Sequence, residues 1–268
     1  MIYFLCSFYG EAEGIISYYK LRKEAVHSSF QIFSSEEIKL IISGTGKINA
    51  ACAVGYIGSL KSKLSKDLFV NVGICGSRSR TVGECVFINK IKDVDTNKEF
   101  YPDILLKHDF EEGNLQTFSI PVTTGQVDDV CDMEGSAFFQ SASKFFQKHE
   151  IALIKIVSDN ANNVNVSGEL VRNLIKKSME KINSYIENYK RIFHEKNFLS
   201  DVCTGNIEKI VSRLRLTESQ SIQLKKAAVA YKIRNGKEFD FEGFLSLEVK
   251  IKNDGRKYFS NLIGSMWK

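Results

Sequence analysis

The chain has 268 residues, of which 43% are hydrophobic and 26% charged, and its formal net charge is +5. This composition is typical of a globular protein and excludes a disordered or fibrous chain. The apolar runs are far shorter than the roughly 20 residues that a bilayer span needs, and the N-terminal run lacks a basic leader. We therefore expect a soluble, cytoplasmic protein with no membrane partner.

Short β-branched runs alternate with helical periods over most of the chain. The predicted strands, in chain order, are Ile2–Phe8, Ile38–Ser43, Leu68–Val72, Cys85–Ile91, Thr117–Val122 and Ile151–Val157. The predicted helices are Ile48–Leu60, Glu134–His149 and Ser167–Phe193. Alternating strands and helices predict a layered α/β domain with a largely parallel sheet over residues 1–197.

Residues 198–268 are predicted to form a small helical extension. Thr217 and Gln220 match a capping box that begins a helix, Asn235-Gly236 would end it, and Asp240 is placed to cap another. From Leu199 onward the sequence has 13 Lys and Arg against 8 Asp and Glu, so this segment carries the whole net charge of +5. Because no aromatic-basic binding motif accompanies it, we interpret the charge as a solvated helical surface and expect no nucleic-acid partner.

The six cysteines are scattered without CxxC spacing, and the four histidines show neither HExxH nor paired spacing. The cysteine pattern is typical of small buried side chains in a reducing compartment, not of a disulfide framework. The histidine pattern does not match a metal site. We expect neither a metal nor any other cofactor.

Two glycine-containing turns follow predicted strands. The run Ser43–Lys47 is not a Walker motif, because Ile41 and Ile48 stand where the first glycine and the final hydroxyl residue belong. The run Val72–Ser77 lacks GxGxxG spacing. Such turns are more often tight strand exits than binding sites, but in an open α/β sheet ligands bind at the carboxyl ends of the strands, where both turns are predicted to lie.

Carboxylates also gather at the predicted strand exits. Glu11 and Glu13 follow the first strand, Asp132 and Glu134 begin a helix, and Asp159 follows the last strand. One carboxylate at a helix start is usually a cap. In a parallel sheet these three groups would converge on one crevice, so a shared site and separate capping roles are both open from the residues alone.

Four motifs, in chain order, carry a resemblance. Ile42–Ala51 is similar to an SGxGKxxAA segment, Asn71–Gly76 to an N-x-G-[ST]-A-G turn, Asp132–Phe138 to an [ED]-M-E-[GA]-x-A motif, and Lys155–Asp159 to an R-x-[IV]-S-D motif. Together they resemble the superfamily of purine nucleoside phosphorylases and methylthioadenosine/S-adenosylhomocysteine nucleosidases. The resemblance implies a three-layer α/β fold with a mixed central sheet, and cleavage of the bond between ribose and a purine base.

The resemblance also implies roles for individual residues. Asp159 would be the general acid that protonates the purine N7. Glu13 would activate the attacking water, with Glu11 as the alternative, since spacing does not decide between them. Glu134 would bind two ribose hydroxyls, and Met133 would pack beneath the sugar.

The same resemblance places further residues in the substrate site. Thr45 would lie near the 5′ side of the sugar and Ile74 near the reacting face, although both positions also suit simple turn packing. Asp132 and Ser158 complete the substrate-binding set.

Water is favoured over phosphate as the nucleophile. Phosphorylases of the superfamily hold phosphate with arginines and a hydroxyl residue in the turn where this chain has Ile74, with Asn71 before it. A dianionic phosphate without a paired guanidinium is costly to bind. A purine nucleoside phosphorylase stays the alternative if Arg78 or Arg80 reaches the pocket.

The chain also departs from the superfamily pattern. Lys155 replaces the usual arginine, and the segment Thr123–Gln126 is followed almost at once by Asp132, which shortens the base-binding loop and leaves no identifiable stacking aromatic. A futalosine-hydrolase-like enzyme and a catalytically degenerate nucleoside-binding or regulatory protein are therefore further alternatives. The resemblance implies a homo-oligomer, a dimer or larger, and we hypothesise that the extension modifies this assembly or recruits a partner.

Overall fold

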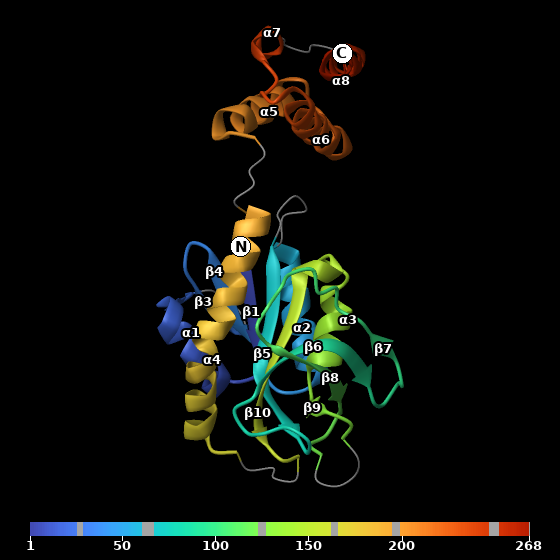
Figure 1. Ribbon diagram of the computed structural model, residues 1–268. Coiled ribbons are helices and arrows are strands. Elements are labelled where there is room, and N and C mark those ends of the chain that lie inside the picture. Colours follow the sequence, from blue (N-terminus) through green and yellow to red (C-terminus); the bar gives the residue numbers. More distant parts are fainter. Residues whose placement is uncertain are drawn as a thin grey trace. The chain divides into compact units, whose positions relative to one another are not determined.

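The computed structural model describes residues 1–25, 29–60, 67–122, 127–161, 166–194, 199–246 and 252–267. It divides the chain into two compact units, Met1–Lys190 and Arg191–Lys268 (Figure 1). We call them unit 1 and unit 2. The predicted domain boundary at residue 197 lies outside the described residues.

Unit 1 is built on a mixed sheet. Its strands among the described residues are β1 (Ile2–Cys6), β2 (Arg22–Lys23), β3 (Gln31–Ser34), β4 (Ile38–Ile42), β5 (Leu68–Ser77), β6 (Cys85–Asp93), β7 (Glu99–Phe100), β8 (Glu111–Thr117), β9 (Val130–Asp132) and β10 (Ile151–Asp159). Strands β4, β1, β5 and β10 run parallel in that spatial order. Nearly all their residues are buried, as expected for strands covered on both faces.

The far side of the sheet closes on itself. Strand β10 pairs antiparallel with β6, β6 and β8 pair in parallel, and β8 and β9 pair in parallel. Strand β9 then pairs antiparallel with the end of β5, between Cys131 and Gly76. This closure brings the ends of β5, β9 and β10 together, although they are far apart in the sequence.

The sheet is covered, within the described ranges, by four helices: α1 (Tyr9–Tyr19), α2 (Lys47–Leu60), α3 (Gly135–Ala142) and α4 (Gly168–Tyr189). Helices α1 and α4 pack against each other, as do α2 and α3, and the two pairs lie on opposite sides of the sheet (Figure 1). Gly14 of α1 approaches Ile175 of α4 so closely that a Cβ there would lie 2.9 Å from the isoleucine. The three-layer α/β fold predicted from the sequence is confirmed.

Several predicted elements differ from the structure. The strand predicted over Thr117–Val122 ends where it was expected to begin, because β8 pairs with β6 and β9 only up to Thr117. Helix α3 ends at Ala142, well before the predicted His149. Helix α1 was not predicted at all. Within the described residues, no helix is long and apolar enough to cross a bilayer.

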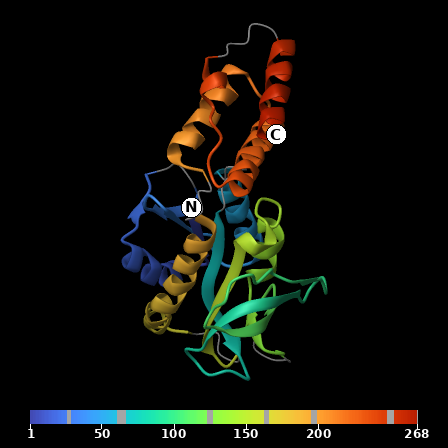
Figure 2. The same ribbon diagram turned by 45° about the horizontal axis from the view of Figure 1, so that its top comes forward.

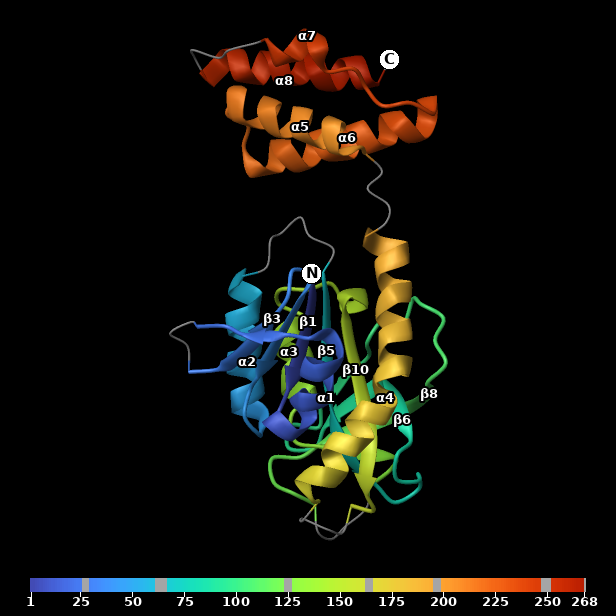
Figure 3. The same cartoon turned by 90° about the vertical axis from the view of Figure 1, so that its left-hand side faces the viewer.

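Unit 2 contains α5 (Asp201–Arg213), α6 (Glu218–Asn235), α7 (Glu242–Leu245) and α8 (Lys252–Met266). Its helices pack side by side around their own apolar core, which includes Ile207, Leu224 and Leu262 (Figures 2 and 3). The predicted capping box of Thr217 is present, and Gly236 ends α6 in the left-handed conformation. A separate core of this kind is what an independently stabilised unit requires.

Candidate active site

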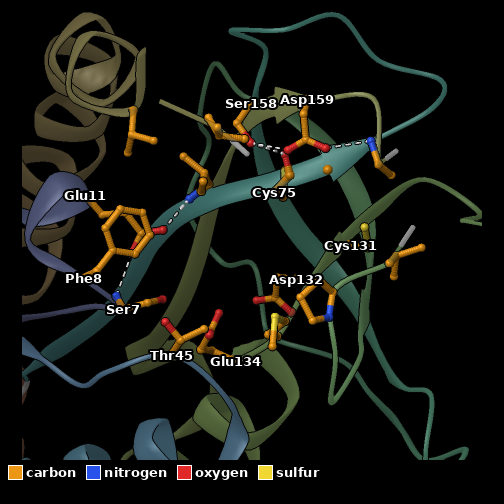
Figure 4. Close-up of a pocket in the computed structure, with 18 of the residues that line it drawn as sticks. Ser7, Phe8, Glu11, Thr45, Cys75, Cys131, Asp132, Glu134, Ser158 and Asp159 are labelled. Carbon is orange, nitrogen blue, oxygen red and sulfur yellow. Dashed lines mark hydrogen bonds between the residues drawn. The ribbon is translucent and has the colours of Figure 1, made fainter. Parts of the chain in front are cut away.

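A pocket of about 290 Å³ lies in unit 1 at the carboxyl ends of β1, β5, β9 and β10 (Figure 4). Ligand sites of layered α/β proteins occur at this edge of the sheet. The described residues that line it are Ser7, Phe8, Glu11, Thr45, Ile74, Cys75, Gly76, Ile120, Pro121, Val122, Cys131, Asp132, Met133, Glu134, Ser158, Asp159, Ala161, Val166 and Val171.

Glu11 reaches the pocket from the first turn of α1. Its two carboxylate oxygens accept hydrogen bonds from the backbone N–H groups of Ser7, at 2.7 Å, and Ile74, at 2.8 Å. The carboxylate lies against the backbone of β5, where a Cβ on Gly73 would stand 2.7 Å from Glu11 Oε1. Burial raises the pKa of this carboxyl above its ordinary value, despite the two N–H donors and the nearby Lys155. A fixed carboxylate with a raised pKa suits a general base.

Glu134 lies immediately before α3 and is 6% exposed. Its Oε1 accepts a hydrogen bond of 2.6 Å from the backbone N–H of Gly46, in the turn before α2. Both Gly44 and Gly46 have positive φ, of 87° and 96°, so this turn needs glycine to aim the N–H at the carboxylate. Burial, followed by the repulsion of Asp132, raises the pKa of Glu134 to about 7.

Asp132, which lines the pocket, forms a buried ion pair with Lys155, which does not. Lys155 Nζ lies 2.8 Å from Asp132 Oδ2, and both side chains are 1% exposed. Asp132 also accepts hydrogen bonds from the Thr117 hydroxyl and the Gly135 N–H. Burial opposes the charge on Lys155, but neighbouring carboxyls, Asp132 foremost, outweigh it and raise the lysine's pKa. With its partners satisfied, Asp132 is placed to hold the start of α3 in position.

Asp159 ends β10 on the opposite side of the pocket from Glu134 (Figure 4). Its Oδ1 accepts a hydrogen bond of 2.8 Å from the Ala161 N–H, and its Oδ2 lies 2.7 Å from the Ser158 hydroxyl. That hydroxyl is also 3.2 Å from the Cys75 carbonyl oxygen, so it has an alternative acceptor. Asp159 is among the residues that line the pocket, so its carboxyl group is held at the pocket by these contacts.

Glu13 does not line this pocket. It lies on another side of α1, where its Oε2 is 3.5 Å from Arg172 Nε and its side chain is 39% exposed. The structure therefore does not place Glu13 beside Glu134 and Asp159, because α1 begins at Tyr9 and residues two apart on a helix point in nearly opposite directions. The alternative, Glu11, is the carboxylate that the structure brings together with Glu134 and Asp159.

The other predicted site residues, Thr45, Ile74, Met133 and Ser158, also line the pocket. The predicted base segment Thr123–Gln126 lies outside the described residues. Just before it, Ile120–Val122 forms an apolar wall. Sequence analysis missed this wall and also Phe8, whose ring is the one aromatic among the described lining residues. The apolar run after Thr117, assigned to a strand, was the signal that the sequence offered.

No arginine, lysine or histidine is among the described residues that line the pocket. Arg80 is held elsewhere, with its guanidinium 2.9 Å from Asp129 Oδ2 and in a second ion pair with Glu84. Arg78 is not a lining residue. In the part of the chain that the structure describes, no group of His, Cys, Asp and Glu side chains is arranged to hold a metal ion.

The fold of unit 1 is similar to that of solved 5′-methylthioadenosine/S-adenosylhomocysteine nucleosidases. No protein-family model and no curated protein sequence matches the chain. The likeness thus rests on structure, and it establishes the fold.

The nucleosidase of Streptococcus pneumoniae, solved with the transition-state inhibitor MT-ImmA, is 18% identical with a TM-score of 0.56, over 70% of this chain and 98% of that one. The S-adenosylhomocysteine nucleosidase of Streptococcus pyogenes, in complex with 5-methylthiotubericidin, is 17% identical with a TM-score of 0.59, over 70% and 96%. The 5′-methylthioadenosine nucleosidase of Arabidopsis thaliana is 13% identical with a TM-score of 0.57, over 70% and 95%.

Proposed function

We propose that unit 1 hydrolyses the N-glycosidic bond of a purine nucleoside of the methylthioadenosine or adenosylhomocysteine type. The observation that carries the proposal is the convergence of three carboxyl groups, Glu11, Glu134 and Asp159, on one pocket at the carboxyl edge of the sheet. The nucleosidases that share the fold bind methylthioadenosine analogues, as the complexes from the two streptococci illustrate.

Each carboxyl group has a separate task in the proposed reaction. Asp159 donates a proton to N7 of the base, which makes the base a neutral leaving group as the bond from C1′ to N9 breaks. Glu134 accepts hydrogen bonds from two ribose hydroxyls and orients the sugar. Glu11 accepts a proton from a water molecule whose oxygen forms the new bond to C1′. The products are the free base and the sugar with a hydroxyl on C1′.

The lining favours water over phosphate as the nucleophile. A bound phosphate dianion requires cationic donors, and arginine supplies them best because its planar fork matches the anion. The described lining residues include no cation, and the Arg80 guanidinium is paired with Asp129 and Glu84. The backbone N–H of Ile74, which would otherwise face an anion, donates to Glu11.

Base release measured by chromatography tests this function. The purified chain is incubated with methylthioadenosine, adenosylhomocysteine, inosine, adenosine and futalosine, with and without phosphate. We expect phosphate-independent release that Asp159→Asn and Glu11→Gln each reduce by at least about 100-fold, whereas Glu13→Gln retains activity. Release that requires phosphate would make the protein a phosphorylase, and no release from any nucleoside would favour a binding protein.

We also propose that the protein assembles as a homo-oligomer. On the outer side of α2 and α3, Ile48 is 80% exposed, and Phe145 just after α3 is 43% exposed. Exposed apolar side chains that lie together are typical of protein interfaces. Light scattering on the full chain and on Ile48→Lys measures the mass, and a monomeric wild type would contradict the proposal. Removing residues 199–268 tests whether unit 2 modifies the assembly.

A further inference from the structure

Two carboxylates, one on the last residue of β6 and one in the turn between β6 and β7, contact the same lysine. Lys47 Nζ is 2.7 Å from Asp93 Oδ2 and 2.6 Å from Asp95 Oδ2. The Lys47 side chain is 18% exposed and that of Asp93 7%, so the first pair is largely shielded from water. None of these three residues lines the pocket of unit 1. Contacts through these residues nevertheless reach three segments that line the pocket, namely the glycine turn before α2, the start of α3 and Ile120–Val122.

The first connection joins the glycine turn to the start of α3. Lys47 directly follows Gly46, whose N–H holds the Glu134 carboxylate. Asp93 Oδ2 accepts a hydrogen bond of 2.6 Å from the Ser136 hydroxyl, two residues after Glu134. Asp93 is itself fixed by the N–H and hydroxyl of Thr96, both at 2.9 Å. The two ends of the contact between Gly46 and Glu134 are therefore also tied together through Lys47 and Asp93.

The second connection reaches the apolar wall of the pocket. Asp95 Oδ2 accepts a hydrogen bond from the Ser119 hydroxyl. Ser119 directly precedes Ile120–Val122, which lines the pocket. The same ammonium group thus links the turn that holds Glu134 to the segment that forms the apolar wall of the pocket.

Helix α2 gives no reason for a lysine at this position. Lys47 is the first residue of α2, whose first turn contains no acidic side chain. The helix dipole makes this end electropositive, so it disfavours a cation there. The stabilisation of the Lys47 ammonium comes from the two carboxylates of the neighbouring turn, which belong to a different part of the sheet.

We propose that Lys47 is a positioning residue, which through Asp93 and Asp95 holds the glycine turn, Glu134 and the Ile120–Val122 wall at a fixed separation. This inference rests on the proposed nucleosidase function, since Glu134 is the group proposed to bind the ribose hydroxyls. Asp95, which is 48% exposed, supplies the link to the wall, and Asp93 supplies the link to Glu134.

The test compares Lys47→Met with Lys39→Met. Lys39 forms an ion pair of 2.8 Å with Glu24 and is 21% exposed, similar to Lys47, but it lies outside the pocket. We expect Lys47→Met to raise KM for methylthioadenosine about tenfold with a smaller change in kcat, because the ribose contacts are present before and during bond cleavage. Lys39→Met should leave both constants within about twofold of the wild type.

A second readout distinguishes positioning from general stability. The preference for methylthioadenosine over its 3′-deoxy analogue reports the contact of Glu134 with the ribose. It should shrink several-fold in Lys47→Met and persist in Lys39→Met, even where both variants melt at the same temperature. Asp95→Asn should give a smaller loss that does not add to that of Lys47→Met, because both changes break the same link. Lys47→Arg should restore part of the lost affinity.

Binding measured without turnover separates this inference from the proposed function. In the Asp159→Asn background, titration calorimetry with methylthioadenosine should show a Kd about tenfold weaker when Lys47→Met is added. If the wild type releases no base but this weakening is observed, the proposed function fails and the positioning role stands. An unchanged Kd and 3′-deoxy preference in Lys47→Met, or no binding in either background, would overturn the positioning role.

Discussion

Replacing Glu134 by glutamine is expected to change how the stability of unit 1 depends on pH. The glutamine keeps an oxygen that accepts the Gly46 N–H and removes a group that ionises inside the protein. Burial raises the pKa of Glu134 to about 7, whereas an unfolded glutamate titrates near 4.5. Between these two values the folded protein keeps a proton that the unfolded chain has released. The stability of the wild type therefore falls as the pH rises through this window.

The size of the effect follows from the shift. The difference of 2.5 pKa units corresponds to about 3 kcal/mol. Relative to the wild type, Glu134→Gln should gain about this much unfolding free energy between pH 4.5 and pH 8, and no more above that. Glu13→Gln is the matched control, since Glu13 is 39% exposed and lies outside the pocket.

Urea unfolding at several pH values measures the difference. Circular dichroism follows both units, while the chain's one tryptophan, Trp267, lies in unit 2 and reports that unit by fluorescence. The gain should appear in the transition of unit 1 and leave the fluorescence transition unchanged. A difference that stays constant with pH, or a wild type that becomes relatively more stable as the pH rises, would refute the reasoning.

Three further changes test individual contacts. Gly73→Ala would place a Cβ 2.7 Å from Glu11 Oε1 and so displace the carboxylate. We expect base release to fall about 100-fold while the circular dichroism spectrum stays unchanged. Full activity would contradict the contact between Glu11 and Gly73. Lys155→Met removes the buried ion-pair partner of Asp132, so the unfolding free energy of unit 1 measured in urea should drop by about 3–5 kcal/mol. An unshifted midpoint would count against the ion pair. Thr217→Ala removes the N-cap of α6 and should cost about 1 kcal/mol in the Trp267 transition, with Thr217→Ser close to wild type; equal losses for both would exclude capping as the cause.

The positions of Asp159 and Glu134 were predictable because each belongs to a motif beside a strong local signal. The apolar run Ile151–Val157 identifies β10, and its end fixes where Asp159 emerges. Glu134 is buried at the start of a helix, as expected. Both depend on short stretches of sequence, for which periodicity and turn residues are informative.

The choice between Glu11 and Glu13 needed a helix that the sequence analysis did not identify. Once α1 is known to begin at Tyr9, the helical repeat of about 3.6 residues places the two glutamates on different faces of the helix. Glu11 lies four residues before Ile15, which is buried, whereas Glu13 lies four residues before Ser17, which is exposed. The apolar face of this short helix was the available signal.

The closed side of the sheet could not be predicted from local patterns. Strand β9 has three residues, and it exists because β5 and β8 bracket it. Pairings between residues so far apart in sequence depend on the packing of the whole domain, which no local period encodes. The contacts of Lys47 with Asp93 and Asp95 are of the same kind, since they join segments more than forty residues apart in the chain.

The approach of Glu11 to Gly73 has a consequence for how this sequence can change. The carboxylate of one residue occupies the space that a side chain on the other would fill. A glycine inside a strand is normally a weak point, open to replacement by almost any β-forming residue. Here such a replacement displaces the Glu11 carboxylate unless position 11 shortens at the same time. Homologues that carry a larger residue at position 73 should therefore lack glutamate at position 11, and with it the proposed base for water.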